Sequence, residues 1–251
     1  MKMKMVALTL AVTTFFTGCV GVSFIGENFG GGSGGPAIRG TGEKISHEFD
    51  VSSFSGLRLG GIYNVTYRPH ETHRVVIEIQ ENLLPHVAVY ITGNILQIGS
   101  DRDFRVDPDF VPNVYVYSPH LSSLSVSGVV NFQTDDIVAA DDFSINISGV
   151  GNVALSLDVG ELDINTAGAG NLNIYGIADN TEIVISGAGS INAAELETRN
   201  ADVRVSGAGS VNIAVSENLN ASISGVGSIT YHGNPNVTQS VSGIGGVRRA
   251  G

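Results

Sequence analysis

The chain has 251 residues, 42% of them hydrophobic, which fits a folded protein with a real core and excludes a disordered chain. Its formal net charge is −11, from 24 acidic and 13 basic residues, and it has no concentrated basic segment, so we expect no nucleic-acid partner. Glycine occurs 33 times and tryptophan is absent, which indicates that the glycine excess serves the architecture.

The first 18 residues are predicted to be an export signal. Lys2 and Lys4 precede an apolar segment, Met5 to Phe16, that is too short to span a bilayer as a mature helix. The following Phe16-Thr17-Gly18-Cys19 resembles the lipobox of bacterial lipoproteins, although Phe16 stands where Leu is usual. The resemblance implies cleavage before Cys19 and lipidation of this residue. Cys19 is the single cysteine, so no intrachain disulfide is possible, and the alternative interpretation is a buried structural thiol.

Residues 19–42 are expected to form the lipidated cysteine and a flexible tether, because Gly30–Pro36 is glycine-rich and has no periodicity. A phosphate-binding loop is not favoured there, since no strand precedes the glycines and no Lys-Ser/Thr pair follows them. We divide the folded region into a first β part, residues 43–123, and a region of regular repeats, residues 124–251. Alternating or β-branched runs in the first part predict strands at 49–59, 75–79, 87–91, 96–98 and 114–117.

A six-residue unit recurs in the second part, with the pattern Ser/Ala-Gly-x-Gly-Asn/Ser followed by an apolar residue. A period near 20 residues with strand-type alternation is typical of a β-solenoid with one coil per repeat. We therefore predict an all-β protein: a right-handed parallel β-helix or β-solenoid with coils of about 20 residues, preceded by a less regular β part. The first glycines of the units are Gly128, Gly149, Gly168, Gly187, Gly207, Gly225 and Gly243.

Strict alternation assigns the two faces of each strand. Ile145, Ile147, Gly149, Gly151 and Val153 share one parity, and the β-branched residues among them place this set in the interior. Both glycines of a unit are thus expected to point inward. Two causes fit: the opposite wall of a narrow coil comes too close for a side chain, or the strand bends through backbone angles that glycine adopts readily.

The other parity faces outward and predicts columns of small polar and apolar side chains, stacked from coil to coil as hydrogen-bonding ladders. The resulting flat face has no large or charged residues. We take it as the candidate binding face, formed by Ser148, Asn152, Asn171, Ser186, Ala188, Ser190, Ser206, Ala208, Ser210, Ser224 and Ser228.

Few residues suggest catalysis or metal binding. His70 and His73 could ligate a metal but are better explained as part of an exposed turn after Pro69. The pairs Asp135-Asp136 and Asp141-Asp142 could bind calcium, but solvated loop charge is favoured because the repeated calcium pattern of β-rolls is absent. The flat face has no acid–base groups that would act near neutral pH. We therefore predict no catalytic residue, no metal ligand and no cofactor.

The chain resembles the bacterial family called putative autotransporter adhesin, head GIN domain. The resemblance covers roughly residues 48–247 and implies an exported, β-helical domain in the envelope of Gram-negative bacteria. The residues that carry it are Phe54–Leu59 with Gly61–Val65, Asn82-Leu83-Leu84, Leu96-Gln97-Ile98 and the serial Ser-Gly-x-Gly units.

These observations predict a non-enzymatic lipoprotein of the cell envelope, anchored in a membrane through Cys19, whose adhesin-like solenoid binds a glycan or an envelope protein. Val20 after the cysteine, rather than Asp, favours the outer membrane. One alternative is a carbohydrate-active β-helix enzyme, with acidic residues converging from loops 101–109 and 135–142. Another is a structural or signalling element of the envelope.

Overall fold

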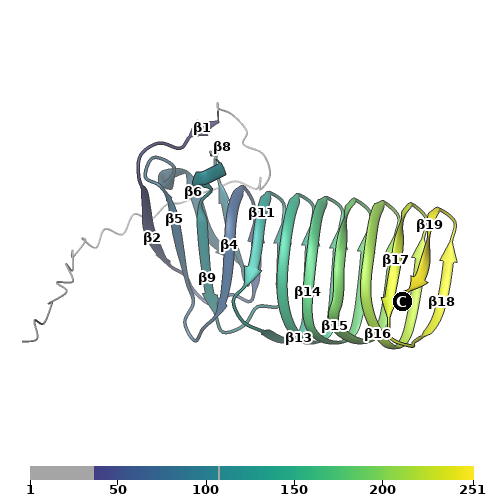
Figure 1. Ribbon diagram of the computed structural model, residues 1–251. Helices are drawn as coiled ribbons and strands as arrows, with labels where there is room; N and C mark the ends of the chain where they lie inside the picture. Colours follow the sequence, from purple (N-terminus) through teal and green to yellow (C-terminus); the bar gives the residue numbers. More distant parts are fainter. Residues whose placement is uncertain (1–36, 107) are drawn as a thin grey trace, which may run out of the picture.

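The computed structural model describes residues 37–106 and 108–251. The predicted signal peptide, Cys19 and most of the tether lie outside the described residues and stay predictions. The described chain forms one elongated body, with an irregular β part at one end and a regular stack of turns at the other (Figure 1). Within this part of the chain, no helix has the length and apolarity needed to cross a membrane.

The described chain is 73% β-strand, with two short 3-10 turns, η1 (Leu84–His86) and η2 (Pro108–Phe110). The strands are β1 (Ile38–Arg39), β2 (Lys44–Asp50), β3 (Gly56–Leu59), β4 (Ile62–Pro69), β5 (Arg74–Gln80), β6 (Val87–Thr92), β7 (Ile95–Ser100), β8 (Phe104–Arg105), β9 (Asn113–Ser118), β10 (Ser123–Val126), β11 (Val129–Thr134), β12 (Val138–Ile147), β13 (Val150–Thr166), β14 (Ala169–Ile185), β15 (Ala188–Val205), β16 (Ala208–Ile223), β17 (Val226–His232), β18 (Asn236–Val241) and β19 (Ile244–Arg249).

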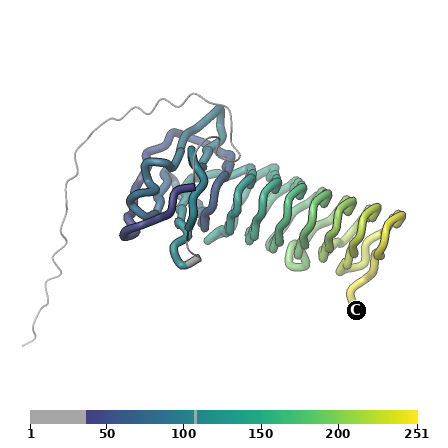
Figure 2. Tube along the Cα trace, turned by 90° about the horizontal axis from the view of Figure 1, so that it is seen from above, coloured from purple at the N-terminus to yellow at the C-terminus, as the bar shows by residue number. Residues whose placement is uncertain are grey.

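The strands stack in parallel as a β-solenoid of about 7 turns with coils of about 19 residues, which confirms the predicted fold. Each turn contributes to two faces. We call one the front face; it consists of β9, β4, β11, the first halves of β13 to β16, then β17 and β19. We call the other the back face; it consists of β7, β3, β10, β12, the second halves of β13 to β16, and β18. Seen from above, the turns follow one another as narrow loops (Figure 2).

The stack does not follow chain order at its N-terminal end. The turn made by β3 and β4 lies between β7 and β9 on one side and β10 and β11 on the other. The chain therefore runs back after β4 to add strands beneath its own first turn. There β2, β5 and β6 pair antiparallel with their neighbours and close this end of the solenoid.

The alternation predicted from the sequence is present throughout the stack. Ile145, Ile147 and Val153 are buried, whereas Asn146 and Asn152 between them are exposed. The Ser-Gly pair of each unit falls at a break between two strands, for example between Ile147 and Val150. It is thus the corner where the chain passes from the back face to the front face.

The repeated glycines have a different cause from the two that the sequence suggested. At Gly187, a Cβ atom would lie 2.0 Å from the carbonyl oxygen of Gly168 in the preceding turn, and at Gly189 it would lie 2.1 Å from that of Gly170. At Gly187 and Gly189 the Cβ position therefore points along the stack and not inward. At Gly209 and Gly227 it would also meet the buried side chains of Ile185 and Val205, so the inward expectation is wrong for the first glycine of each unit and holds only in part for the second. None of these glycines has a positive φ angle. Close stacking of successive turns, rather than an opposite wall or special backbone angles, excludes a side chain here.

Two buried tyrosines anchor the irregular part to the stack. Tyr63 is 1% exposed and donates a hydrogen bond to the carbonyl oxygen of Gly99 at 3.0 Å. Tyr67 is also buried and donates to the carbonyl oxygen of Ser118 at 2.9 Å. Burial raises the pKa of both hydroxyl groups above the ordinary value.

We expect alkaline pH to destabilise the fold through Tyr63. The unfolded tyrosine ionises near pH 10, whereas the buried one keeps its proton, so the unfolding free energy should fall as pH rises through that value. The loss should be about 1.4 kcal/mol per pH unit for each such tyrosine. Tyr63→Phe should cost about 1 kcal/mol near neutral pH through the lost hydrogen bond, but should reduce the alkaline slope. Urea titrations followed by circular dichroism between pH 8 and 11 would measure both, and an unchanged slope would contradict the assignment.

The C-terminal end of the stack is open. Among the described strands, β18 pairs only with β16 and β19 only with β17. All six residues of β18 are exposed, and Ile244 in β19 is 73% exposed. The two ends of the solenoid therefore differ, since antiparallel strands cover only the N-terminal one.

Candidate functional site

A column of asparagine and serine side chains crosses the front face. Asn131, Asn152 and Asn171 lie in register on β11, β13 and β14, and Ser190 continues the column on β15. The structure extends this predicted column in the N-terminal direction to Asn64 on β4 and Asn113 on β9. We call the set from Asn113 to Ser190 the asparagine ladder.

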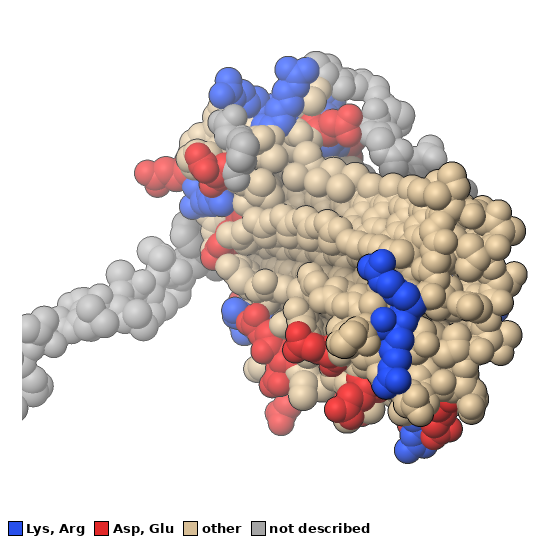
Figure 3. All heavy atoms as spheres, turned by 45° about the vertical axis from the view of Figure 1, so that its right-hand side comes forward, with Lys and Arg blue, Asp and Glu red and all other residues tan. Residues whose placement is uncertain are grey.

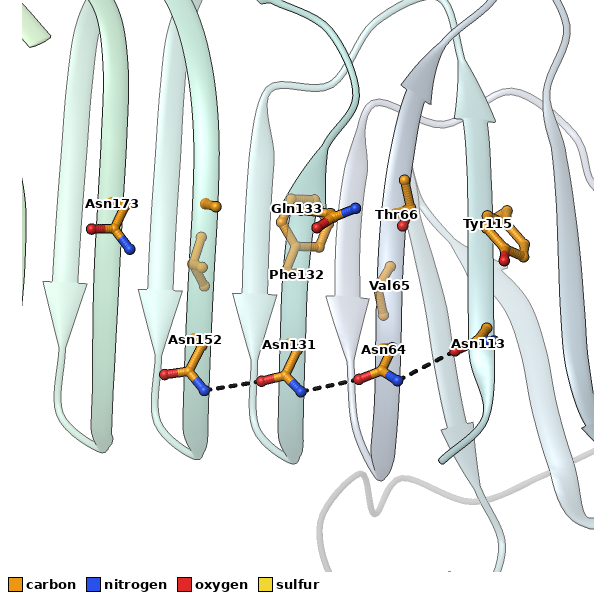
Figure 4. A pocket seen from close by; sticks show the side chains of 12 residues that line it. Asn64, Val65, Thr66, Asn113, Tyr115, Asn131, Phe132, Gln133, Asn152 and Asn173 are labelled. Atoms are coloured by element: carbon orange, nitrogen blue, oxygen red, sulfur yellow. Dashed lines mark hydrogen bonds between the residues drawn. The ribbon is translucent and has the colours of Figure 1, made fainter. Parts of the chain in front are cut away.

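Each member of the asparagine ladder donates a hydrogen bond to the side chain before it in the stack. Nδ2 of Asn152 donates to Oδ1 of Asn131 at 2.9 Å, and Nδ2 of Asn131 donates to Oδ1 of Asn64 at 3.0 Å. Nδ2 of Asn64 donates to Oδ1 of Asn113 at 3.3 Å (Figure 4). Asn113 in turn donates to the Glu78 carboxylate at 3.0 Å. All bonds run in one direction, and a carboxylate, which only accepts, ends the series.

A second ladder on the back face has the same construction. Asn236, Asn218, Asn200 and Asn180 donate in turn, each to the residue before it in the stack, and Asn180 donates to Glu161 at 2.7 Å. Each ladder thus ends at a glutamate on its N-terminal side. In both of these series a carboxylate accepts the hydrogen bond of the last amide.

Beside the asparagine ladder, the front face is hollowed into a groove of about 400 Å³ that crosses β9, β4, β11, β13 and β14. The side chains two residues further along these strands form its other border, with Tyr115, Thr66, Gln133 and Asn173 in one row (Figure 4). The groove is lined by Asn64, Val65, Thr66, Asn113, Tyr115, Asn131, Phe132, Gln133, Asn152, Val153, Ala154 and Asn173.

The small side chain of Ala154 makes the groove deeper at one point of this row. Ala154 lies in register between Gln133 and Asn173, and its methyl group replaces an amide at that position. Tyr115 stands at the opposite, N-terminal end of the groove. Its hydroxyl lies 3.4 Å from the Glu78 carboxylate, and the Arg68 guanidinium lies 5.1 Å from its ring centre.

The groove is uncharged although the protein is acidic. None of the twelve lining residues carries a charge. A space-filling view shows a broad surface of uncharged residues along the solenoid. Charged groups gather around the N-terminal part and along one rim, and a few basic side chains cross the surface at the end that faces the viewer (Figure 3). The back face, by contrast, stacks Asp142 next to Glu161 and Asp163 next to Glu182. Burial and these neighbouring carboxylates raise the pKa of Asp163.

The residues of the predicted binding face have different surroundings. The corner serines Ser148, Ser186 and Ser206 are exposed, but each hydroxyl donates to a backbone carbonyl of the preceding turn at 3.3 Å. These hydroxyls therefore help to hold successive turns together. Ser210, Ser224, Ala188 and Ala208 are exposed, Ser190 and Ser228 are half-buried, and only Asn152 of the predicted set lines the groove.

The residues considered for metal or acid–base chemistry have separate partners. Nδ1 of His70 lies 2.9 Å from the Thr72 hydroxyl, whereas His73 packs edge-on against Phe54. Asp101 lies 3.1 Å from His86, and Asp135 forms an ion pair with Arg68 at 2.5 Å. In the described parts of the chain, no group of three or more His, Cys, Asp or Glu residues is placed to hold a metal ion.

A second hollow of about 500 Å³ lies farther along the stack, where β15 bulges between Ala193 and Asn200. Its border includes an ion pair between Arg199 and Asp179 at 3.4 Å, together with Glu197 and the exposed Ile177. Unlike the groove, it has no ladder of polar side chains across several turns.

Comparison with known proteins adds a family and a fold. The family model described as "Putative auto-transporter adhesin, head GIN domain" matches residues 53–235. A putative adhesin from Bacteroides fragilis has a similar structure, with 24% identity, a TM-score of 0.81, and 85% of this chain and 100% of that chain covered. A putative adhesin from Parabacteroides distasonis gives 24% identity, a TM-score of 0.74, and 86% and 100% coverage. A putative lipid binding protein from Parabacteroides distasonis has 20% identity and a TM-score of 0.68, with 86% of this chain and 100% of that chain covered. At these identities the likeness shows the fold alone, and no curated protein matches the sequence.

Proposed function

The chain belongs to the putative auto-transporter adhesin, head GIN domain family, and from this premise we propose that it is a non-enzymatic envelope lipoprotein that binds its ligand through the front face. The adhesin-like family fits a surface or extracellular location. The export signal and Cys19 support lipid anchoring, and Val20 supports the outer membrane. The proposed partners are the membrane, through the lipid, and a glycan or envelope protein, through the solenoid.

The observation that carries the binding role is the front face itself. A series of amide side chains, each with hydrogen-bonding capacity left over, borders a groove on an exposed and uncharged surface. The back face is acidic, and its stacked carboxylates would repel anionic ligands. The acidic loop residues that the alternative enzyme would need do not converge on one site: Asp101 contacts His86, whereas Asp135 pairs with Arg68.

Cys19→Ala should release the protein from the membrane. Cells grown with an alkyne fatty acid should label the native chain and not the variant, and the variant should move to the soluble fraction. Ser23→Ala is a suitable control, because it changes a residue of the same segment and leaves Cys19 intact. Continued labelling and membrane fractionation of Cys19→Ala would refute the anchor.

Arginine placed on the front face should abolish ligand binding without unfolding the protein. We would measure binding of the full chain, made as Cys19→Ala for solubility, to immobilised neutral glycans, anionic glycans, collagen and fibronectin. The double variant Ala154→Arg/Ala188→Arg should lose at least about tenfold in affinity, a change of about 1.4 kcal/mol. Asn146→Arg, at an exposed position of the back face, is the control. The proposal would be contradicted if Asn146→Arg lost as much affinity as the double variant. It would also be contradicted if the protein without front-face substitutions bound none of the immobilised glycans and proteins.

A further inference from the structure

We propose that the groove over Ala154 binds a neutral polysaccharide, lying along the axis of the solenoid with its hydroxyl groups on the two rows of amides. This inference rests on the proposed binding function and specifies its site and ligand. Of the residues that line the groove, only Asn152 belongs to the binding face predicted from the sequence. Four features of the groove support the proposal: its shape, its hydrogen-bonding groups, its lack of charge and its small apolar surface.

The shape fits an extended chain. The groove crosses five neighbouring strands, which at about 4.8 Å per strand gives a length of roughly 19 Å. Its volume of about 400 Å³ falls within the range of sites for small ligands. The two borders are only two residues apart on each strand, so the groove is longer than it is wide. A linear ligand can therefore occupy it only when it runs across the strands.

The amide side chains along the groove can form hydrogen bonds with the hydroxyl groups of a sugar. Each asparagine of the ladder uses one N–H and one oxygen lone pair on its neighbours, as Asn131 does between Asn64 and Asn152. A second N–H and a second lone pair remain for a ligand. Gln133 and Asn173 add further amides on the opposite border. Such a surface alternates donors and acceptors, and a sugar hydroxyl, which does both, can pair with either kind.

The charges argue for a neutral ligand. No lining residue is charged, so a sulfated or uronic-acid polymer would find no counter-charge in the groove. Arg68, whose guanidinium lies against the ring of Tyr115, is paired with Asp135. At the N-terminal end, the Glu78 carboxylate accepts the last bond of the asparagine ladder and would repel an anion.

The apolar surface is small and lies at one end. The side chains of Val65, Phe132 and Val153 point into the core and are 1–2% exposed, so the floor gives a lipid chain nothing to bury. Phe132 is buried, whereas Tyr115 is only half-buried; its hydroxyl contacts Glu78 and its ring contacts the guanidinium of Arg68. A fixed aromatic ring of this kind can stack on the C–H face of a pyranose.

The test measures the affinity of the full chain, as Cys19→Ala, for dextran, mannan and cello-oligosaccharides. Polygalacturonate, heparin and phosphatidylcholine vesicles represent anionic glycans and lipid. We expect binding to at least one neutral glycan, with Ala154→Arg weakening it by about tenfold or more. Tyr115→Ala should weaken it by about tenfold, as expected for loss of an aromatic contact. Ala139→Arg, an exposed alanine outside the groove, should leave it unchanged.

The outcomes separate this inference from the broader function. If Ala154→Arg binds normally but Ala188→Arg does not, the groove is wrong and the front face stands. Preferential binding to the anionic glycans or to vesicles would also overturn the neutral ligand. If the unsubstituted groove binds none of the glycans, proteins or vesicles, both proposals fail. Gln133→Ala with Asn173→Ala provides a second test that adds no bulk, and it should reduce the affinity several-fold; unchanged affinity in this double variant would refute the role of the amides.

Discussion

Replacing Gly189 with valine should destabilise the protein by about 3 kcal/mol or more. A Cβ atom at this position would lie 2.1 Å from the carbonyl oxygen of Gly170, and the atom it meets belongs to backbone that cannot rotate away. The two turns must then separate or tilt, which breaks parallel strand pairing between β14 and β15. Because the chain has no tryptophan, urea unfolding followed by far-UV circular dichroism is the appropriate measurement.

Gly151 supplies the matched control, since it occupies the same position in an earlier unit. A Cβ there would have its nearest neighbours at 3.6–3.8 Å, which is ordinary contact. Gly151→Ala should therefore leave stability unchanged or raise it by up to about 1 kcal/mol, through reduced freedom of the unfolded chain. Similar destabilisation by Gly151→Ala and Gly189→Ala would show that stacking distance is not the reason for the glycines.

Phe143→Ala should cost about 3–5 kcal/mol. The ring is 1% exposed in β12, where it is in register with the buried Leu162 of the next turn. Its removal would leave a cavity between turns that have no other element to fill it, because each turn contacts only its neighbours. Phe143→Leu should cost less than about 1.5 kcal/mol. The same urea titration would test this, and a loss below 1 kcal/mol for the alanine variant would mean that the coil collapses around the cavity.

The regular half of the fold could be predicted because one physical rule repeats there. Alternation identifies the buried Ile145 and Ile147, and a period near 20 residues requires that equivalent residues stack in register. Asn131, Asn152 and Asn171 fall in one column for that reason. Gln133 and Asn173, which border the groove, lie two residues further along the same strands and could have been found by the same alternation.

The N-terminal half of the groove could not be found in this way. Asn113 and Tyr115 lie on β9, which matches no repeat unit and is inserted beneath β4 by a reversal of chain order. A sequence pattern shows which residues share a face but not which strand the chain will return to. The reason why glycine recurs in every unit could not be predicted on related grounds. The clash that excludes a side chain arises between successive turns, whereas alternation describes only a single strand.

The direction of the amide ladders has a consequence for how this architecture can vary in length. The back-face ladder is terminated at Glu161, and at its other end Asn236 on β18, the last described strand of that face, presents an unused amide oxygen. An additional repeat unit at the C-terminal side would find an acceptor already in place and would need no new terminating residue. Duplication or loss of units at that end is therefore compatible with the same N-terminal cap and the same groove. The length of the solenoid can therefore change at this end without altering the residues that line the groove.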